Sequence, residues 1–184
     1  MFHYNSIYWI ILLVSDKYES EEPEEMKVDN DCELIWAKLK IKGSKDLYIA
    51  SCYRPPDNRN IIYLENLQTY LANILAHEGA HIWLGGYFNL SGIDWQNVNI
   101  KHNSQHTAEF HELLDISKHA FLDDPVLQPT QITETQSNTL DLSFTNNNTL
   151  VNQVRVIPGI SDHEAAAIES SLRPIKKLGI TREV

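Results

Sequence analysis

Hydrophobic and polar residues alternate along the early part of the chain in the manner of β-strands. Residues 33–41 (ELIWAKLKI) place apolar and mixed side chains on opposite faces. Residues 47–53 (LYIASCY) form a second β-prone run, and the turn residues 43–46 (GSKD) between the two predict a β-hairpin. The apolar run at residues 7–14 (IYWIILLV) predicts a further, buried strand.

Helical spacing replaces this alternation between residues 60 and 77. The apolar positions of this segment are Leu64, Leu67, Leu71, Ile74 and Leu75. They predict an amphipathic helix that closes near Gly79 and is followed by a short buried strand at residues 81–85. A second helix is predicted over residues 107–114, with Phe110, Leu113 and Leu114 turned inward.

The C-terminal third is again typical of strands. Residues 140–145 and 150–157 are β-prone and are separated by the polar turn 146–148, and residues 164–172 form another such run. Hairpins and helical crossovers in one chain favour mixed β-sheets covered by helices over a purely parallel sheet.

Composition restricts the class of protein. The chain has 184 residues, 42% hydrophobic and 22% charged, which is typical of one folded soluble domain. Two cysteines make no disulfide framework. No apolar run approaches the roughly 20 residues that span a bilayer, and the N-terminus lacks the basic region of a signal peptide. We therefore expect an intracellular protein, nuclear or cytoplasmic, that is neither secreted nor inserted in a membrane.

The net charge of −10 is concentrated in one segment. Residues 16–33 hold nine acidic residues and two lysines, so the rest of the chain sums to only −3. A nucleic-acid partner therefore stays possible, because a metal ion and local cations can neutralise phosphates. The candidate cations are Lys38, Lys40, Lys42, Lys45, Arg173, Lys176, Lys177 and Arg182, which could equally serve solubility alone.

One short motif suggests zinc chemistry. The segment His77-Glu78-Gly79-Ala80-His81 matches H-E-x-x-H, in which two histidines one helical turn apart bind zinc. The motif requires a continuous helix, and Gly79 interrupts the helical pattern at its centre. A zinc metalloprotease is therefore a remote alternative.

Polar residues gather where predicted strands end. They are Tyr53, Arg54, Asn89, Asp141, Asp162 and His163. In α/β folds such strand ends and the adjoining loops are where functional sites are built. A carboxylate, an imidazole, an amide and a phenol together could carry out phosphoryl transfer.

An ordered set of motifs contains these residues. They are the segments 53–56 (YRPP), 85–90 (GGYFNL), 93–95 (IDW), 129–130 (PT), 138–146 (NTLDLSFTN) and 158–163 (PGISDH). In this order they resemble the endonuclease/exonuclease/phosphatase superfamily. More narrowly, they resemble the apurinic-type endonuclease domain of non-LTR retrotransposons of the jockey and related groups. The resemblance extends from residue 15 to the C-terminus, and residues 1–14 match poorly.

The resemblance implies a four-layered α/β sandwich, in which two mixed β-sheets lie face to face with helices outside. It implies hydrolysis of a DNA phosphodiester that depends on Mg²⁺, with Mn²⁺ as a possible substitute. DNA is the implied partner, together with a reverse transcriptase domain encoded downstream. The tyrosine matching Tyr53 binds the scissile phosphate in this family, and Arg54 is a possible further phosphate contact.

The resemblance also implies roles for the remaining polar residues. The residue matching Asn89 places phosphate and nucleophile, and that matching Asp141 orients the histidine matching His163. The residue matching Asp162 belongs to the metal and proton-handling network. An imidazole held by a carboxylate, beside a hard cation, suits the charge that develops on phosphate.

Two departures from the family pattern predict impaired catalysis. Tyr87 stands where the family has a nucleophile-activating aspartate, and a phenol with a pKa near 10 is neither a useful base at pH 7 nor a good Mg²⁺ ligand. The upstream glutamate that binds the metal has no counterpart before Ser15, and the acidic residues 19–25 do not replace it. We therefore expect an N-terminally truncated nuclease domain that lacks its first strands and binds Mg²⁺ weakly or not at all.

Two alternatives stay open beside an impaired nuclease. One is an inactive relic of the same fold that binds DNA or protein, and the other is an active enzyme for a different phosphate ester. A truncated sheet would also leave one edge strand uncovered, which favours self-association.

Overall fold

A five-stranded mixed sheet organises the computed structural model, which describes residues 10–23, 26, 33–55, 61–76, 79–102, 104–105, 107–134, 137–159 and 163–177. The strand order is β1-β2-β3-β4-β9. These strands are β1 (Ser20–Glu21), β2 (Glu33–Leu39), β3 (Leu47–Tyr53), β4 (His81–Tyr87) and β9 (Asp141–Thr145). β3 and β4 pair in parallel, and the other neighbours pair antiparallel.

The predicted hairpin is confirmed by β2 and β3. Their register runs from Glu33 opposite Tyr53 to Leu39 opposite Leu47. Helix α1 (Ile62–Ala76) then carries the chain from β3 to the parallel strand β4, since parallel neighbours need such a crossover.

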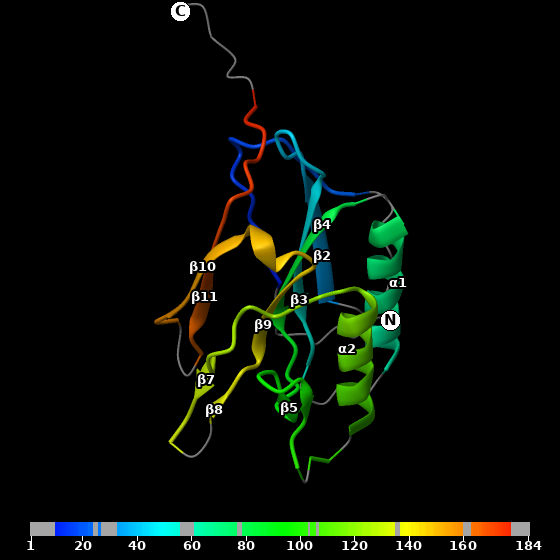
Figure 1. The fold of residues 1–184 in the computed structure, drawn as a ribbon, viewed down its shortest axis with the longest axis vertical. Helices are drawn as coiled ribbons and strands as arrows, with labels where there is room; N and C mark the ends of the chain where they lie inside the picture. Colours follow the sequence, from blue (N-terminus) through cyan, green and yellow to red (C-terminus); the bar gives the residue numbers. More distant parts are fainter. Residues whose placement is uncertain are drawn as a thin grey trace, which may run out of the picture.

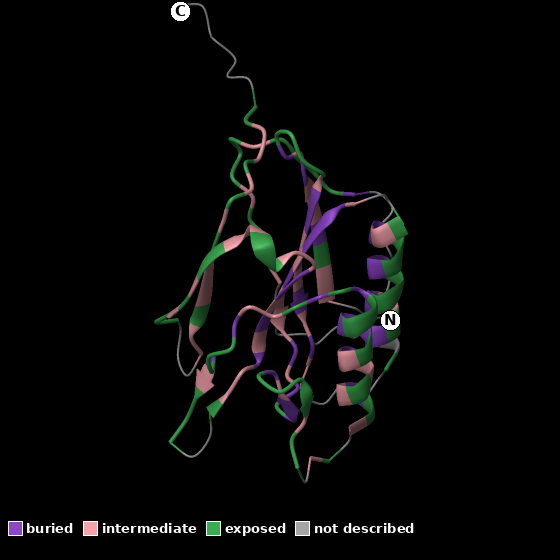
Figure 2. Cartoon of the chain, viewed as in Figure 1, coloured by how far each residue is buried: buried purple, intermediate pink, exposed green. Residues whose placement is uncertain are grey.

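Both described helices, α1 and α2 (Thr107–His119), cover the same face of the sheet (Figure 1). Of the apolar positions predicted for α1, Leu64, Leu67, Leu71 and Ile74 are buried in one cluster with Trp36 and Leu84 of the sheet, and Leu75 is partly buried against it; Figure 2 shows the buried side of this helical layer. α2 extends five residues beyond its predicted end, because Ile116 continues the buried stripe begun by Leu113. Neither helix is long and apolar enough to cross a membrane, nor is any other helix in the described part of the chain.

The opposite face of the sheet is covered by a second, two-stranded sheet (Figure 1). A short 3₁₀ helix, η2 (Asn148–Leu150), leads into β10 (Val151–Ile157), which pairs antiparallel with β11 (Ala165–Ser170). Val151 and Ile168 of this pair line a small cavity of about 140 Å³ together with Trp83 of β4. The two sheets therefore lie face to face with helices outside, which confirms the predicted α/β sandwich class.

Two small antiparallel pairs complete the described elements. They are β5 (Ile93–Asp94) with β6 (Asn99–Ile100), and β7 (Gln131–Ile132) with β8 (Ser137–Asn138). Asp94 shapes the first turn, because its carboxylate accepts hydrogen bonds from the backbone of residues 96 and 97. A hydrogen bond from the Asn97 side chain, together with these backbone hydrogen bonds, lowers the pKa of Asp94.

The predicted strand over residues 7–14 is wrong for residues 10–14, which form no strand, while residues 7–9 lie outside the described residues. Ile11 and Leu13 are largely exposed, whereas Val14 packs against the cluster around Leu39. β1, which follows this segment, pairs with Lys38 and Leu39 at the end of β2. The chain before β1 instead runs beside the C-terminal segment, where Tyr18 pairs with Lys176.

We still expect self-association, and the second sheet indicates which strands would pair with another chain. Within the described residues, β10 and β11 pair only with each other, so each presents an outer edge. Unpaired backbone groups at such edges favour pairing with another chain. We expect dimers or larger species in size-exclusion chromatography at high protein concentration, and a monomer throughout would contradict this expectation.

Candidate functional site

Three strand ends bring their polar residues into one row. Tyr87 at the end of β4 is in register with Tyr53 of β3 on one side and with Asp141 of β9 on the other. Paired residues of neighbouring strands share a face of the sheet, so the three side chains lie together. The rings of Tyr53 and Tyr87 stack with their centroids 5.9 Å apart.

His163 joins this row from the loop before β11. Its Nδ1 lies 2.9 Å from the Asp141 Oδ2, and both side chains are about 30% exposed. A neutral imidazole that donates from Nδ1 to a carboxylate keeps Nε2 as an acceptor. The amide nitrogen of Gln131 lies 3.5 Å from that Nε2. Asp141 thus holds the ring in one tautomer and one orientation.

Tyr87 occupies the centre of the site. Its hydroxyl donates to Asn89 Oδ1 at 3.2 Å, and its ring meets the His163 ring edge-on at a centroid distance of 5.0 Å. Asn89 adopts a left-handed backbone conformation with φ 55°, which asparagine tolerates better than most residues. The phenol therefore lies between Asn89 and His163, both of which the sequence analysis assigned to the site.

Gly86 permits the close approach of β4 to β3 immediately before Tyr87. Its φ is +150°, and a Cβ atom there would lie 1.9 Å from the backbone oxygen of Cys52. Because that neighbour is backbone, no side-chain movement would make room for it. The glycine therefore helps to fix where the Tyr87 side chain begins.

Thr130 is a site residue whose role the sequence analysis did not identify. It is 0% exposed, and its Oγ1 accepts hydrogen bonds from the backbone N–H groups of Leu140 and Asp141 at 3.1 and 2.9 Å. Its backbone oxygen accepts from Glu164 N at 2.7 Å. One residue thus connects the strand that carries Asp141 with the loop that carries His163. The motif at residues 129–130 was the signal for it.

Replacing Thr130 with valine is expected to lower the free energy of unfolding by about 1–3 kcal/mol, because two buried N–H groups lose their acceptor. Urea denaturation measures the effect. Thr139→Val is the matched control, since the Thr139 hydroxyl is exposed and makes one bond, to Gln128 O. Equal stability of Thr130→Val and wild type would contradict the assigned role.

Arg54 lies apart from this cluster. Its side chain is 4% exposed, and burial lowers the pKa of the guanidinium while the charge of Glu109 on α2 opposes that effect. Its backbone N–H donates to Tyr87 O at 2.9 Å. The structure therefore places its backbone, and not its guanidinium, next to the row.

The described residues form no cluster of Mg²⁺ ligands. Among them, no three or more His, Cys, Asp or Glu side chains form a group that could hold a metal. Mg²⁺ prefers carboxylate and other hard oxygen ligands, but Asp141 is already bonded to His163, and Asn89 Oδ1 already accepts from Tyr87. Asp162, the predicted metal ligand, lies outside the described residues.

The zinc motif is divided between different elements. α1 ends at Ala76, and His81 is the first residue of β4, where its Nε2 lies 3.0 Å from Ser44 Oγ. His77 and Glu78 lie outside the described residues. The described part of the motif therefore lacks the single helix that zinc binding by H-E-x-x-H requires.

Asp124, in the loop between α2 and β7, is a second residue that the sequence analysis missed. Its Oδ1 accepts from the N–H groups of Val126 and Ser143, whereas its buried Oδ2 has no hydrogen-bond partner among the described residues. Burial raises the pKa of Asp124 to about 7, and the two backbone hydrogen bonds oppose the shift only partly.

This pKa predicts a pH-dependent stability. Below pH 4, Asp124 carries its proton in both the folded and the unfolded state. Between pH 4 and 7 the unfolded state loses this proton while the folded state keeps it. The free energy of unfolding therefore falls by about 2–4 kcal/mol over this range. Asp124→Asn keeps an acceptor oxygen and should abolish the fall, which makes this variant the more stable one at pH 8. Urea denaturation at several pH values tests this, with the exposed Asp123→Asn as control. A variant less stable than wild type at pH 8 would contradict it.

The fold and this row of side chains define the class of protein. Residues 47–167, about two thirds of the chain, match a family model described as endonuclease-reverse transcriptase. The chain belongs to this family and, through it, to the endonuclease/exonuclease/phosphatase superfamily. No curated protein matches the sequence.

Solved structures share the fold at low sequence identity. The endonuclease domain of TRAS1, a telomere-specific non-LTR retrotransposon, is 17% identical with a TM-score of 0.60, over 81% of this chain and 65% of that domain. The Neisseria 3′ phosphatase NExo, bound to a product DNA hairpin, is 15% identical with a TM-score of 0.54, over 83% and 70%. The catalytic domain of Xenopus laevis APE2 is 17% identical with a TM-score of 0.50, over 78% and 56%. The chain thus spans about two thirds of the TRAS1 domain or less.

Proposed function

We propose that this chain is a retrotransposon-type nuclease domain that engages a DNA phosphate at the ends of β3, β4 and β9 but hydrolyses phosphodiester bonds no faster than a variant without His163. One observation carries the proposal. The Asp141–His163 pair is assembled at 2.9 Å, while the position between it and Asn89 holds the Tyr87 phenol instead of a carboxylate.

The assembled half of the site suits a phosphate ester. An imidazole oriented by a carboxylate can carry the positive charge that stabilises a phosphorane-like transition state. The Tyr53 hydroxyl is a donor suited to a phosphate oxygen. Asn89 would align phosphate and nucleophile from the other side of Tyr87, and Arg54 would stabilise the end of β4 from within.

The other half of the site lacks a proton acceptor. Activating water requires a base whose pKa lies near the working pH, and a phenol at neutral pH keeps its own proton. Such a group commonly contributes about 10²- to 10⁴-fold to the rate. The hydroxyl of Tyr87 also donates a hydrogen bond to Asn89 Oδ1, so this oxygen is already engaged. Both effects lower turnover without preventing phosphate binding.

The binding of a divalent metal is also part of the proposal. We propose that Mg²⁺ or Mn²⁺ binds weakly, with Asp162 as its ligand from this chain, because the described residues contribute no ligand cluster. A metal at this place would supply a charge that stabilises the phosphate oxygens. The proposed macromolecular partners are a DNA target and a reverse transcriptase domain, in keeping with the family description and with the retrotransposon origin of the TRAS1 domain.

Plasmid nicking and DNA binding, measured together, test the proposal. With Mg²⁺ or Mn²⁺, we expect wild type to nick supercoiled plasmid no faster than His163→Ala, while both bind a short duplex equally in a salt-dependent manner. Nicking by wild type that disappears in His163→Ala would overturn the impairment. Loss of duplex binding would overturn the DNA partner.

A further inference from the structure

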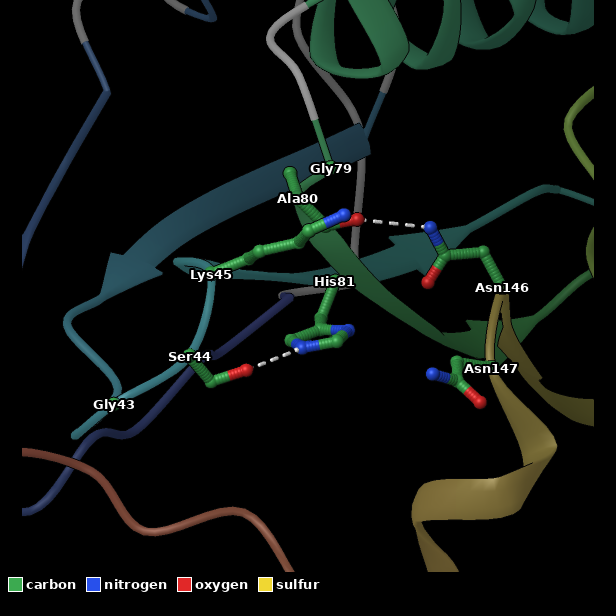
Figure 3. A pocket seen from close by; sticks show the side chains of 8 residues that line it. All are labelled: Gly43, Ser44, Lys45, Gly79, Ala80, His81, Asn146 and Asn147. Carbon is green, nitrogen blue, oxygen red and sulfur yellow. Dashed lines mark hydrogen bonds between the residues drawn. The ribbon is translucent and has the colours of Figure 1, made fainter.

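A hollow of about 660 Å³ lies at the end of β4 opposite Tyr87 (Figure 3). We refer to it as the distal hollow. Three turns line it: residues 43–45 before β3, residues 79–81 at the start of β4, and residues 146–147 after β9. Tyr87 lies six residues along β4 from His81, which corresponds to about 20 Å. The distal hollow is therefore distinct from the Asp141–His163 site.

A histidine and a serine are joined by one hydrogen bond at this hollow. His81 is 9% exposed, its Nε2 lies 3.0 Å from Ser44 Oγ, and its backbone N–H donates to Asp46 O. Burial and the nearby charge of Lys45 lower the pKa of His81, so the imidazole is neutral at pH 7. If Ser44 donates to Nε2, the Nδ1–H is left as a donor; if Nε2 donates, the Ser44 hydroxyl proton is left. In either arrangement, one N–H or O–H donor stays available to a ligand.

A second donor comes from Asn147. Its Oδ1 accepts from the N–H and the hydroxyl of Thr149 at 3.1 and 2.6 Å, which fixes the amide with Nδ2 on the opposite side. Figure 3 shows this nitrogen turned toward His81. The turn is held in place because Asn146 bonds to the backbone of both Ala80 and Ile82.

Lys45 adds a positive charge at the rim. Its side chain occupies the space that Gly79 leaves, because a Cβ on Gly79 would lie 1.9 Å from the Lys45 Nζ. None of the described residues that line the hollow carries a carboxylate. Lys42 is bonded through its backbone to Arg173, which brings another exposed cation to this end of the sheet. In the described part of the chain, neither Lys45 nor Arg173 has an ion-pair partner.

We propose that the distal hollow binds a phosphate group. Amide, imidazole or hydroxyl donors beside a lysine, with no carboxylate among the described lining residues, form a set that satisfies an oxyanion and offers little to a cation. The phosphate could be a free ion or part of a nucleic-acid backbone, which present the same oxygens. The site needs no chemistry at Tyr87, so it stands apart from the proposed nuclease function.

Nuclear magnetic resonance titration of the full chain with inorganic phosphate, and with sulfate as a second probe, tests the site. We expect saturable shifts of the Ser44, His81 and Asn147 amides. Asn147→Asp keeps the oxygen that caps Thr149 but replaces the donor with a negative oxygen, and should weaken binding about tenfold or more. Lys45→Gln should weaken it several-fold. Lys118→Gln, an exposed lysine of α2, is the matched control and should leave the affinity unchanged.

A short DNA duplex distinguishes the two sources of phosphate. Shifts of the same amides at lower duplex concentration, absent in Asn147→Asp, would assign the site to a nucleic-acid backbone. Shifts with inorganic phosphate alone would assign it to a free ion. The proposal is overturned if no probe gives a saturable shift of these amides, or if Asn147→Asp binds as tightly as wild type. Neither result depends on nicking activity.

Discussion

Replacing Tyr87 with aspartate is expected to raise Mg²⁺-dependent nicking of supercoiled plasmid about 10²-fold or more over wild type. The carboxylate would supply the proton acceptor and the hard oxygen ligand that the phenol does not provide. It would also free Asn89 Oδ1 from the Tyr87 hydroxyl. The same substitution should increase the rise in thermal midpoint that Mg²⁺ produces, which differential scanning fluorimetry measures.

Tyr87→Asn separates the charge from the removal of the ring. It matches aspartate in size and clears the same space beside His163, but it brings no charge. We expect no gain in nicking from this variant. An equal gain in both variants would show that relief of crowding, and not a carboxylate, restores activity. If the Tyr87→Asp protein folds but does not nick plasmid, this would favour the alternative of an inactive relic that binds DNA or protein.

Removing His163 in the Tyr87→Asp background is expected to abolish the restored nicking, with a loss of about 10²- to 10⁴-fold. Asp141→Asn should cause a comparable loss, because an amide facing Nδ1 can favour the wrong imidazole tautomer and cannot support its positive charge. Duplex affinity should change little in either variant, so the loss would lie in turnover.

His111→Ala is the control for this experiment. His111 is exposed on α2, away from the three strand ends, and its removal should leave nicking unchanged. If the Tyr87→Asp protein keeps its activity without His163, then the Asp141–His163 pair is a structural contact and the assigned chemistry is wrong.

The types of the principal elements were determined by local sequence pattern. Alternation over residues 33–53 predicted the hairpin, and the spacing of leucines predicted the helix that the structure places at Ile62–Ala76. These patterns are readable because a side chain's direction repeats with the period of its own backbone. The ordered motifs, together with the family model over residues 47–167, also determined the superfamily.

Other features depended on contacts between distant segments. The helix over residues 107–119 is longer than its pattern predicted, because burial of Ile116 rewards another turn. Residues 10–14 are as apolar as many strands, yet they form none: Val14 packs against the cluster around Leu39, while Ile11 and Leu13 are largely exposed. An apolar run indicates that burial is favourable, but it does not indicate which surface of the protein the run will pack against.

The candidate site divides in the same way. The sequence by itself determined which residue types stand at the strand ends, including a tyrosine at position 87, where the resemblance implies an aspartate. Only the tertiary structure decided that Asp141 lies 2.9 Å from His163, that Thr130 ties both to one loop, and that Arg54 is buried beside Glu109. Hydrogen bonds and desolvation depend on distances of a few ångströms between segments far apart in the chain, and these distances are set by packing of the whole domain.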